Sequence, residues 1–300
     1  ISFDNFGEDA ATTRDEQVKQ AASYFESVIS VLYNNQELVD YLANRLVELG
    51  DSVPTNIDNS KVSKSNPLND QSLFDFHNYP SDLFAEAGTT APNRVGFSKV
   101  ASWLNSHSRK NHGRPLFVAM SADLADSTNI SGFSKGRDGM DDLGMYDKHT
   151  NPDSPLMPQG ITEFANAGMM AGLSTVNFNE DTLDDYNGFI GSFSTYGSFS
   201  YLKYGAIRLF SQLAQDSQMK VGKLLWIAGH SGPETAEDSR THFGIFAPGV
   251  TQLFPDGHII NLHPWEHNDV APALAAAFST DVPIVALHLT RPAINIPDRK

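Results

Sequence analysis

The sequence predicts an α/β protein with a doubly wound parallel sheet and helices on both faces, preceded by helices and a long linker. Three observations lead to this fold class. Segments 115–120, 224–228 and 283–289 are short, almost wholly apolar runs, typical of strands buried on both faces. Stretches with helical spacing of apolar residues separate them, as in sheets whose parallel strands are joined by helices. With 300 residues, 40% of them hydrophobic, the chain can bury a sizeable core.

The first fifty residues predict two helices. Thr13 and Glu16 have the spacing of a capping box, and apolar residues follow them at helical intervals. A second helical pattern covers residues 38–49 and is followed by Gly50, a plausible residue just beyond a helix end. Two helices are therefore expected before any strand.

A polar segment separates these helices from the main domain. Residues 51–94 are rich in Ser, Asn, Asp and Pro, which indicates a linker. We therefore expect a helical part at 1–50, the linker at 51–94 and the main domain at 95–300. The elements predicted in the main domain are a helix at 97–104, a strand at 115–120, a loop at 131–158, a helix from Glu163, a strand at 188–193, a helix at 196–216, a strand at 224–228, a strand at 258–262, a helix at 270–278 and a strand at 283–289.

Polar stretches follow four of the predicted strands. They cover residues 121–127, 229–242, 263–267 and 290–291. Because parallel strands end at one edge of their sheet, these loops should lie close together, at the edge where such folds bind ligands.

Composition excludes several function classes. A net charge of −15 argues against a nucleic-acid-binding surface, and anionic substrates would need a local basic pocket. The chain has no cysteine, which removes disulfides, thiolate zinc sites and cysteine nucleophiles. A cytoplasmic protein fits this composition best. No apolar run approaches the length of a membrane span, and the first residue is Ile1, which indicates processing or a fragment.

Glu163 is the most informative single carboxylate. It begins a segment that is otherwise apolar or small, and Thr162 before it is a good N-cap. A helix from Glu163 would be apolar on nearly every face and therefore buried. The helix N-terminus favours the charged carboxylate while desolvation favours the protonated acid. Glu163 is thus either a proton-transfer group or a residue that caps backbone N–H groups.

Two other segments carry histidines. The loop at 229–242 holds His230 and His242 with several carboxylates, equipment for binding a polyol and moving protons, although a solvated turn would look the same. Its Gly-His-Ser-Gly start lacks the spacing of a nucleophile elbow. Residues 263–267 match the His-x-x-Glu-His zinc pattern, but the proline after the first histidine favours a strand-to-helix turn instead.

Together, three motifs resemble one family. Residues 121–124 read Ser-Ala-Asp-Leu, residues 160–164 read Gly-x-x-Glu-Phe, and His230 is followed at fixed spacing by Asp238 and His242. In this order, from about residue 95 to 292, the chain resembles the pyrimidine-binding domain of transketolase, a thiamine-diphosphate enzyme. The resemblance implies the thiamine-diphosphate-binding fold.

The resemblance also implies roles for individual residues. Glu163 would exchange a proton with N1′ of the aminopyrimidine and so act as the catalytic acid and base, with His230 and His242 as further catalytic groups. Leu202 stands where the family has a Tyr, which alters one wall of the pyrimidine site. The remaining cofactor contacts implied are Tyr196, Phe199 and Asp123, and the implied substrate contacts are Asp238, His230, His242, Ser127, Arg291 and Lys99.

The implied activity is transfer of a two-carbon ketol unit between sugar phosphates. The family holds the diphosphate and Mg²⁺ or Ca²⁺ on a second domain through a Gly-Asp-Gly motif, which this sequence lacks. We therefore expect no metal ligands here, and a partner chain or domain in an oligomer whose sites lie at the interface. The chain would be a proteolytic fragment or a split subunit. Phosphoketolase, 1-deoxyxylulose-phosphate synthase and a catalytically silent partner subunit are the alternatives.

Overall fold

The computed structural model describes residues 11–52, 62–122, 124–158, 160–231 and 247–299. The chain divides into two compact units, Ile1–Lys61 and Val62–Lys300. None of the helices in the described ranges combines the length and apolar composition needed to cross a membrane.

The first unit contains two helices, α1 (Arg14–Tyr33) and α2 (Gln36–Asp51). The capping box predicted at Thr13 and Glu16 is confirmed. Gly50, predicted to lie just beyond the second helix, is inside α2, which ends one residue later. Neither helix buries a residue, so most of the apolar residues that produce their periodicity remain exposed.

The second unit is built on a six-stranded parallel sheet with the strand order β3-β2-β4-β5-β7-β6. The predicted α/β fold with a parallel sheet is confirmed. The short edge strand β3 was not expected, because it lies in the predicted loop at 131–158. The strands are β2 (Phe117–Ser121), β3 (Leu156–Met157), β4 (Ile190–Tyr196), β5 (Leu224–Gly229), β6 (Ile259–Leu262) and β7 (Ile284–His288).

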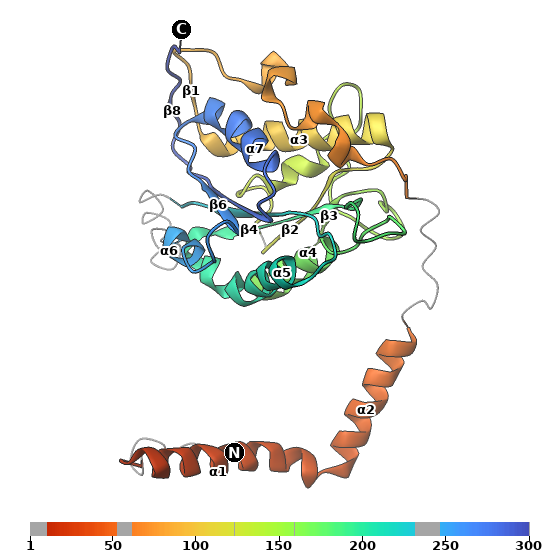
Figure 1. The fold of residues 1–300 in the computed structure, drawn as a ribbon, viewed down its shortest axis with the longest axis vertical. Helices are drawn as coiled ribbons and strands as arrows, with labels where there is room; N and C mark the ends of the chain where they lie inside the picture. Colours follow the sequence, from red (N-terminus) through yellow and green to blue (C-terminus); the bar gives the residue numbers. More distant parts are fainter. Residues whose placement is uncertain (1–10, 53–61, 123, 159, 232–246, 300) are drawn as a thin grey trace. The chain divides into compact units, whose positions relative to one another are not determined.

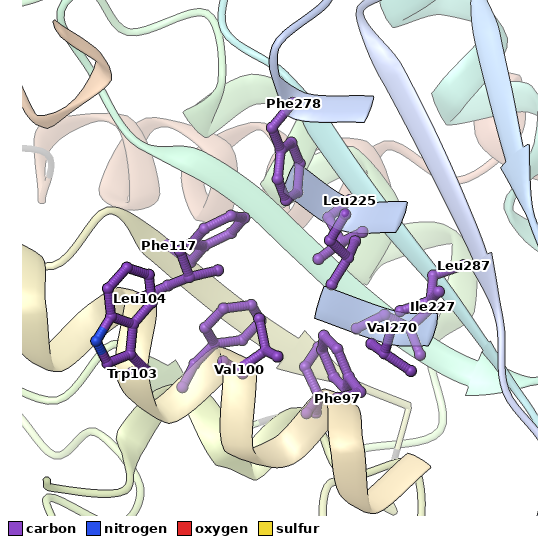
Figure 2. Packing of buried hydrophobic residues seen from close by; sticks show 14 of the residues in the cluster. Phe97, Val100, Trp103, Leu104, Phe117, Leu225, Ile227, Val270, Phe278 and Leu287 are labelled. Atoms are coloured by element: carbon purple, nitrogen blue, oxygen red, sulfur yellow. The ribbon is translucent and has the colours of Figure 1, made fainter. Parts of the chain in front are cut away.

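Helices cover both faces of this sheet (Figure 1). One face carries α3 (Asn93–His112) and α7 (Val270–Phe278), and the other carries α4 (Glu163–Leu173), α5 (Tyr204–Asp216) and α6 (Ala247–Thr251). Alternate residues of each strand point to opposite faces, so Leu225 packs in one hydrophobic cluster and Trp226 in the other. Figure 2 shows the first cluster, in which side chains of α3 and α7 meet those of the central strands.

Three helices differ from the prediction. Helix α3 begins after Pro92 and ends just before Gly113, whose φ of 73° suits glycine, so it is much longer than 97–104. The helix predicted over 196–216 starts with a 3₁₀ segment, η6 (Gly197–Lys203), before α5. Helix α4 is buried on one face only, because Phe164 is 58% exposed.

The described part of the predicted linker packs on the core. Residues 62–94 belong to the second unit, and Leu73, Tyr79 and Leu83 from this segment are buried in the α3 and α7 cluster. The segment forms four 3₁₀ turns, η1 (Pro67–Asn69), η2 (Gln71–Leu73), η3 (Phe76–Asn78) and η4 (Ser81–Leu83), and then strand β1 (Thr90–Ala91), which pairs antiparallel with β8 (Ile294–Asn295). It is therefore a packed strap.

Asp70 fastens this strap to α3. Its Oδ2 lies 3.2 Å from His107 Nε2 and 3.0 Å from His112 Nε2, and Ser72 donates to Oδ1. Burial opposes ionisation, but the hydrogen bonds from His112, Ser72 and His107 outweigh it and lower the pKa of Asp70 to about 2.

Helix α4 approaches the sheet most closely at Gly191. A Cβ at this position would collide with the carbonyl oxygen of Met170 and with Ser174 Oγ. Gly191 N donates to Ser174 Oγ over 2.8 Å, so only a residue without a side chain lets the last turns of α4 rest on β4.

Replacing Leu104 by Ala should lower the free energy of unfolding by about 2–5 kcal/mol, because it leaves a cavity in the α3 cluster. Urea unfolding followed by circular dichroism measures this loss. The matched control is Leu209→Ala on α5, where the side chain is 66% exposed and the cost should stay below about 0.5 kcal/mol. Equal losses in both variants would contradict the packing described.

Replacing Asp70 by Asn should weaken the dependence of stability on acid. The folded pKa of Asp70 is about 2, below its ordinary value of 3.8, so its stabilisation is present above about pH 4 and is lost as the pH falls toward about 2. Urea midpoints measured between about pH 2 and 6 should therefore change less in this variant. Asp153→Asn, which removes an exposed carboxylate, is the control, and an unchanged slope for the Asp70 variant would contradict the prediction.

Candidate functional site

The sheet has a topological switch point between β2 and β4. The chain places β3 on one side of β2 and then β4 on the other side. Ligands of open α/β sheets bind beyond the carboxyl ends of the strands at such a point. The predicted polar loops after β2, β5, β6 and β7 all start at this edge, because the strands are parallel.

Glu163 stands beside this edge as the first residue of α4. It is only 7% exposed, and its Oε1 accepts a hydrogen bond of 3.1 Å from Thr195 Oγ1 on β4. No hydrogen bond from another described residue reaches Oε2. Glu163 therefore bridges helix and strand through one oxygen and keeps the other available at the start of a helix.

Thr162 does not have the role expected from the sequence. The structure gives it no side-chain capping bond. Its hydroxyl donates instead to Gly160 O and to Asn166 Oδ1, each over 3.4 Å. Thr162 does stand at the N-cap position, but no N–H of the first turn donates to its hydroxyl, so the predicted capping bond is wrong.

Three predicted residues meet at the switch point. The ring of Tyr196, at the end of β4, stacks on His230 with 4.0 Å between centroids and 22° between planes. The Tyr196 hydroxyl lies 3.0 Å from Ser127 Oγ. His230 follows β5 and has a φ of 53°, which is uncommon for a residue with a side chain. Because Tyr196 pairs with Gly229 in the sheet, the register brings the two rings together.

Arg94 joins this group and was not predicted. Its Nη1 donates to Ser127 O over 3.2 Å and lies 3.4 Å from His230 Nε2. The residue lies at the end of the predicted linker, where one Arg in a polar segment gives no signal of a site. It adds a cation to the loops of an acidic chain, at the edge where an anionic ligand would enter.

The other predicted site residues are placed less centrally. Lys99 donates to Asp82 O over 3.0 Å and so contacts the strap. Phe199 is half-buried in η6, and Leu202 is 43% exposed. Arg291 is half-buried after β7. Asp123, Asp238 and His242 lie outside the described residues.

The segment at 263–267 is a strand-to-helix turn, as the sequence predicts. Glu266 is fully buried and accepts a hydrogen bond of 2.8 Å from Arg299. His267 Nε2 lies 2.9 Å from Leu83 O, so His267 holds the strap, whereas Glu266 holds Arg299 near the end of the chain. The structure brings no three or more metal-ligating side chains together within the described ranges.

A buried lysine of η6 was also not predicted from the sequence. Lys203, the last residue of η6, is 1% exposed, and its Nζ lies 4.7 Å from the centre of the Phe193 ring and 5.3 Å from that of Trp226. Burial lowers the pKa of Lys203 well below its usual range, and the charge of Glu163 opposes this shift. One Lys in an aromatic run has no recognisable sequence signature.

Comparisons with solved structures identify the fold. The transketolase of Campylobacter jejuni aligns with 20% identity and a TM-score of 0.53, over 75% of this chain and 29% of that chain. A transketolase variant of Pichia stipitis aligns with 16% identity and a TM-score of 0.51, over 95% and 36% of the two chains. The chain thus spans about a third of these enzymes. The likeness shows that it has a fold found in transketolases.

A chain described as a split-gene transketolase, an inactive β4 tetramer, aligns over 70% of this chain and 54% of that chain with 20% identity, and its TM-score of 0.43 is too low to support an argument. No protein-family model matches this chain. No curated protein matches it either.

Replacing Thr195 by Val should cost about 1–3 kcal/mol of stability, because it leaves the buried Oε1 of Glu163 without a donor. In a chain that already carries Glu163→Gln, the same change should cost about 1 kcal/mol less, since the group left unpaired is no longer a carboxylate. Chemical denaturation of the four chains of this double-mutant cycle measures the coupling. Thr195→Ser keeps the hydroxyl and should restore it, and a coupling of zero would show that the contact contributes nothing.

Proposed function

We propose that this chain supplies the pyrimidine side of a thiamine-diphosphate site for transketolase-type transfer of a two-carbon ketol unit between sugar phosphates. One observation carries the proposal. In a fold found in transketolases, a buried carboxylate with an available oxygen stands at a helix start beside the switch point. Glu163 is therefore the proposed catalytic residue.

The described residues fit the pyrimidine half of this cofactor. Glu163 Oε2 can share a proton with a ring nitrogen, while Thr195 fixes the orientation of the carboxyl group. Phe199 and Leu202, from the η6 segment that packs on α4, would border the ring. When bound, the thiazolium of the cofactor would stabilise the negative charge that develops on the carbonyl carbon of the ketose when the bond to the rest of the sugar breaks. The chain's own contribution is to hold the proton at Glu163 and to keep water from it.

The loops at the switch point suit a sugar phosphate. Arg94, Ser127, Tyr196 and His230 supply a guanidinium, two hydroxyls and an imidazole within one contact group. A guanidinium can hold a phosphate with two parallel hydrogen bonds. Arg291 follows the neighbouring strand β7. We propose that Arg94, Ser127, His230 and Arg291, together with Asp238 and His242, bind the hydroxyls and phosphate of the substrate, and that Tyr196 and Asp123 contact the cofactor.

The diphosphate and its metal require a partner chain or domain. The sequence has no Gly-Asp-Gly motif, and the described residues form no metal cluster. Large apolar side chains lie exposed around Glu163: Ile161, Phe164, Tyr201 and Leu202. An exposed apolar group of this kind indicates an interaction surface. We propose that the domain carrying the diphosphate and Mg²⁺ or Ca²⁺ covers it and completes the site in an oligomer.

The decisive test replaces Glu163 by Gln. In a complex reconstituted with a chain that carries the diphosphate motif, thiamine diphosphate and Mg²⁺, ketol transfer from xylulose phosphate to ribose phosphate should fall by about 10²-fold or more, because the amide cannot exchange the proton. Product analysis by mass spectrometry measures the rate. The loss should appear in kcat.

Glu180→Gln is the matched control, since it removes an exposed carboxylate and should leave the rate unchanged. Full activity of the Glu163 variant would refute the assignment. Release of acetyl phosphate would indicate a phosphoketolase, and a requirement for pyruvate would indicate a 1-deoxyxylulose-phosphate synthase. An inactive complex that still forms would leave this chain the role of a silent partner.

A further inference from the structure

Lys203 is a fully buried amine without a hydrogen bond. It is 1% exposed, and its Nζ has no hydrogen-bond partner among the described residues. Two aromatic faces lie beneath it, those of Phe193 and Trp226. Buried lysines are rare unless an opposite charge or hydrogen bonds compensate them. The buried amine of Lys203 therefore requires a nearby group of opposite charge.

The sheet register places Glu163 close to this amine. Phe193 and Thr195 point to the same face of β4, because they are two positions apart. Lys203 Nζ lies over the first, and Glu163 is bonded to the second. Two positions along a strand correspond to about 7 Å. The amine and the carboxylate thus occupy neighbouring places on one buried face.

The histidines of the same row do not match the charge. His288 lies across the sheet from Thr195, with Ala228 between them, and it stacks on His263 with 4.2 Å between centroids. Burial, followed by the charges of His263 and Lys203, lowers the pKa of His288 to about 3. The His288 ring is therefore neutral, and the charge of Lys203 contributes to its lowered pKa.

The elements packed against η6 are α4, α5, α6, β4 and β5. Helix α6 and strand β5 contain no ionisable residue. The carboxylate whose charge acts on Lys203 is that of Glu163. The ionisable groups of these elements are Glu163 on α4, Tyr204, Arg208 and Asp216 on α5, and Tyr196 on β4.

We propose that Lys203 is a positioning residue for Glu163, and that the two form a buried pair in which a charge on one group is matched by a charge on the other. A lone carboxylate in this place would be strongly disfavoured. The ammonium group of Lys203 supplies the opposite charge, so the pair as a whole is neutral. The pair goes beyond the proposed function, because it exists without any cofactor.

The pair can be observed by titrating Lys203 in the full chain. Carbon-13 NMR of chains labelled at lysine Cε reports each amine, and Lys203→Met identifies the resonance. Replacing Glu163 by Gln should lower the titration midpoint of Lys203 by about one pH unit or more, since the compensating charge is gone. Glu180→Gln should leave it in place. Equal midpoints in the unaltered chain and the Glu163 variant would overturn the proposal. No cofactor or partner is needed, so this result is independent of ketol transfer.

Thermal unfolding gives a second measurement. Lys203→Met should lower Tm in the unaltered chain, because it leaves the buried carboxylate of Glu163 without a matching charge. In a chain that already carries Glu163→Gln, the same change should lower Tm less or raise it, because no carboxylate is then left unpaired. Lys223→Met is the matched control, since Lys223 Nζ donates to the carbonyls of Thr280 and Val282 and its loss should lower Tm equally in both chains. Equal changes in Tm for Lys203→Met in the two chains would show that Lys203 acts independently of Glu163, and would overturn the proposal.

Discussion

The hydrogen bond between Thr195 and Glu163 is the contact on which the site depends. It joins the first turn of α4 to the end of β4, beside the switch point at which the order of the strands reverses. Through it, the parallel sheet determines where a single carboxylate stands. Because the donor is a side chain on a strand buried on both faces, Glu163 is held by the central sheet rather than by a loop.

The central strands could be predicted from the sequence because they are buried on both faces. Continuous apolar runs such as 224–228 require no knowledge of their neighbours. The strap at 62–94 could not be predicted in the same way. Only a few of its side chains are buried, Leu73, Tyr79 and Leu83 among them, and they are spaced with neither a helical nor a strand period. Their burial depends on α3, the next helix along the chain, and on α7, which lies far away in the sequence.

The site, too, contains residues that could be predicted from the sequence and residues that could not. The motif around Glu163 places a carboxylate at a helix start, and the structure has it there. The motif does not contain Thr195, Arg94 or Lys203, because their importance comes from register and packing rather than from spacing along the chain. Thr162 illustrates the opposite error, since a good N-cap residue donates its hydroxyl elsewhere. Local propensity is a weak guide where tertiary contacts compete for the same side chain.

The close packing at Gly191 affects the whole of helix α4, including Glu163 at its start. The far end of the helix rests on β4 at a place where even one methyl group would strike the backbone of Met170, and the near end carries Glu163. Replacing Gly191 by Ala would therefore tilt helix α4 and move the carboxylate of Glu163 at its other end. The orientation of Glu163 therefore depends on Gly191, although Gly191 packs against the opposite end of α4. Engineering the chemistry at Glu163 has to take the packing at Gly191 into account.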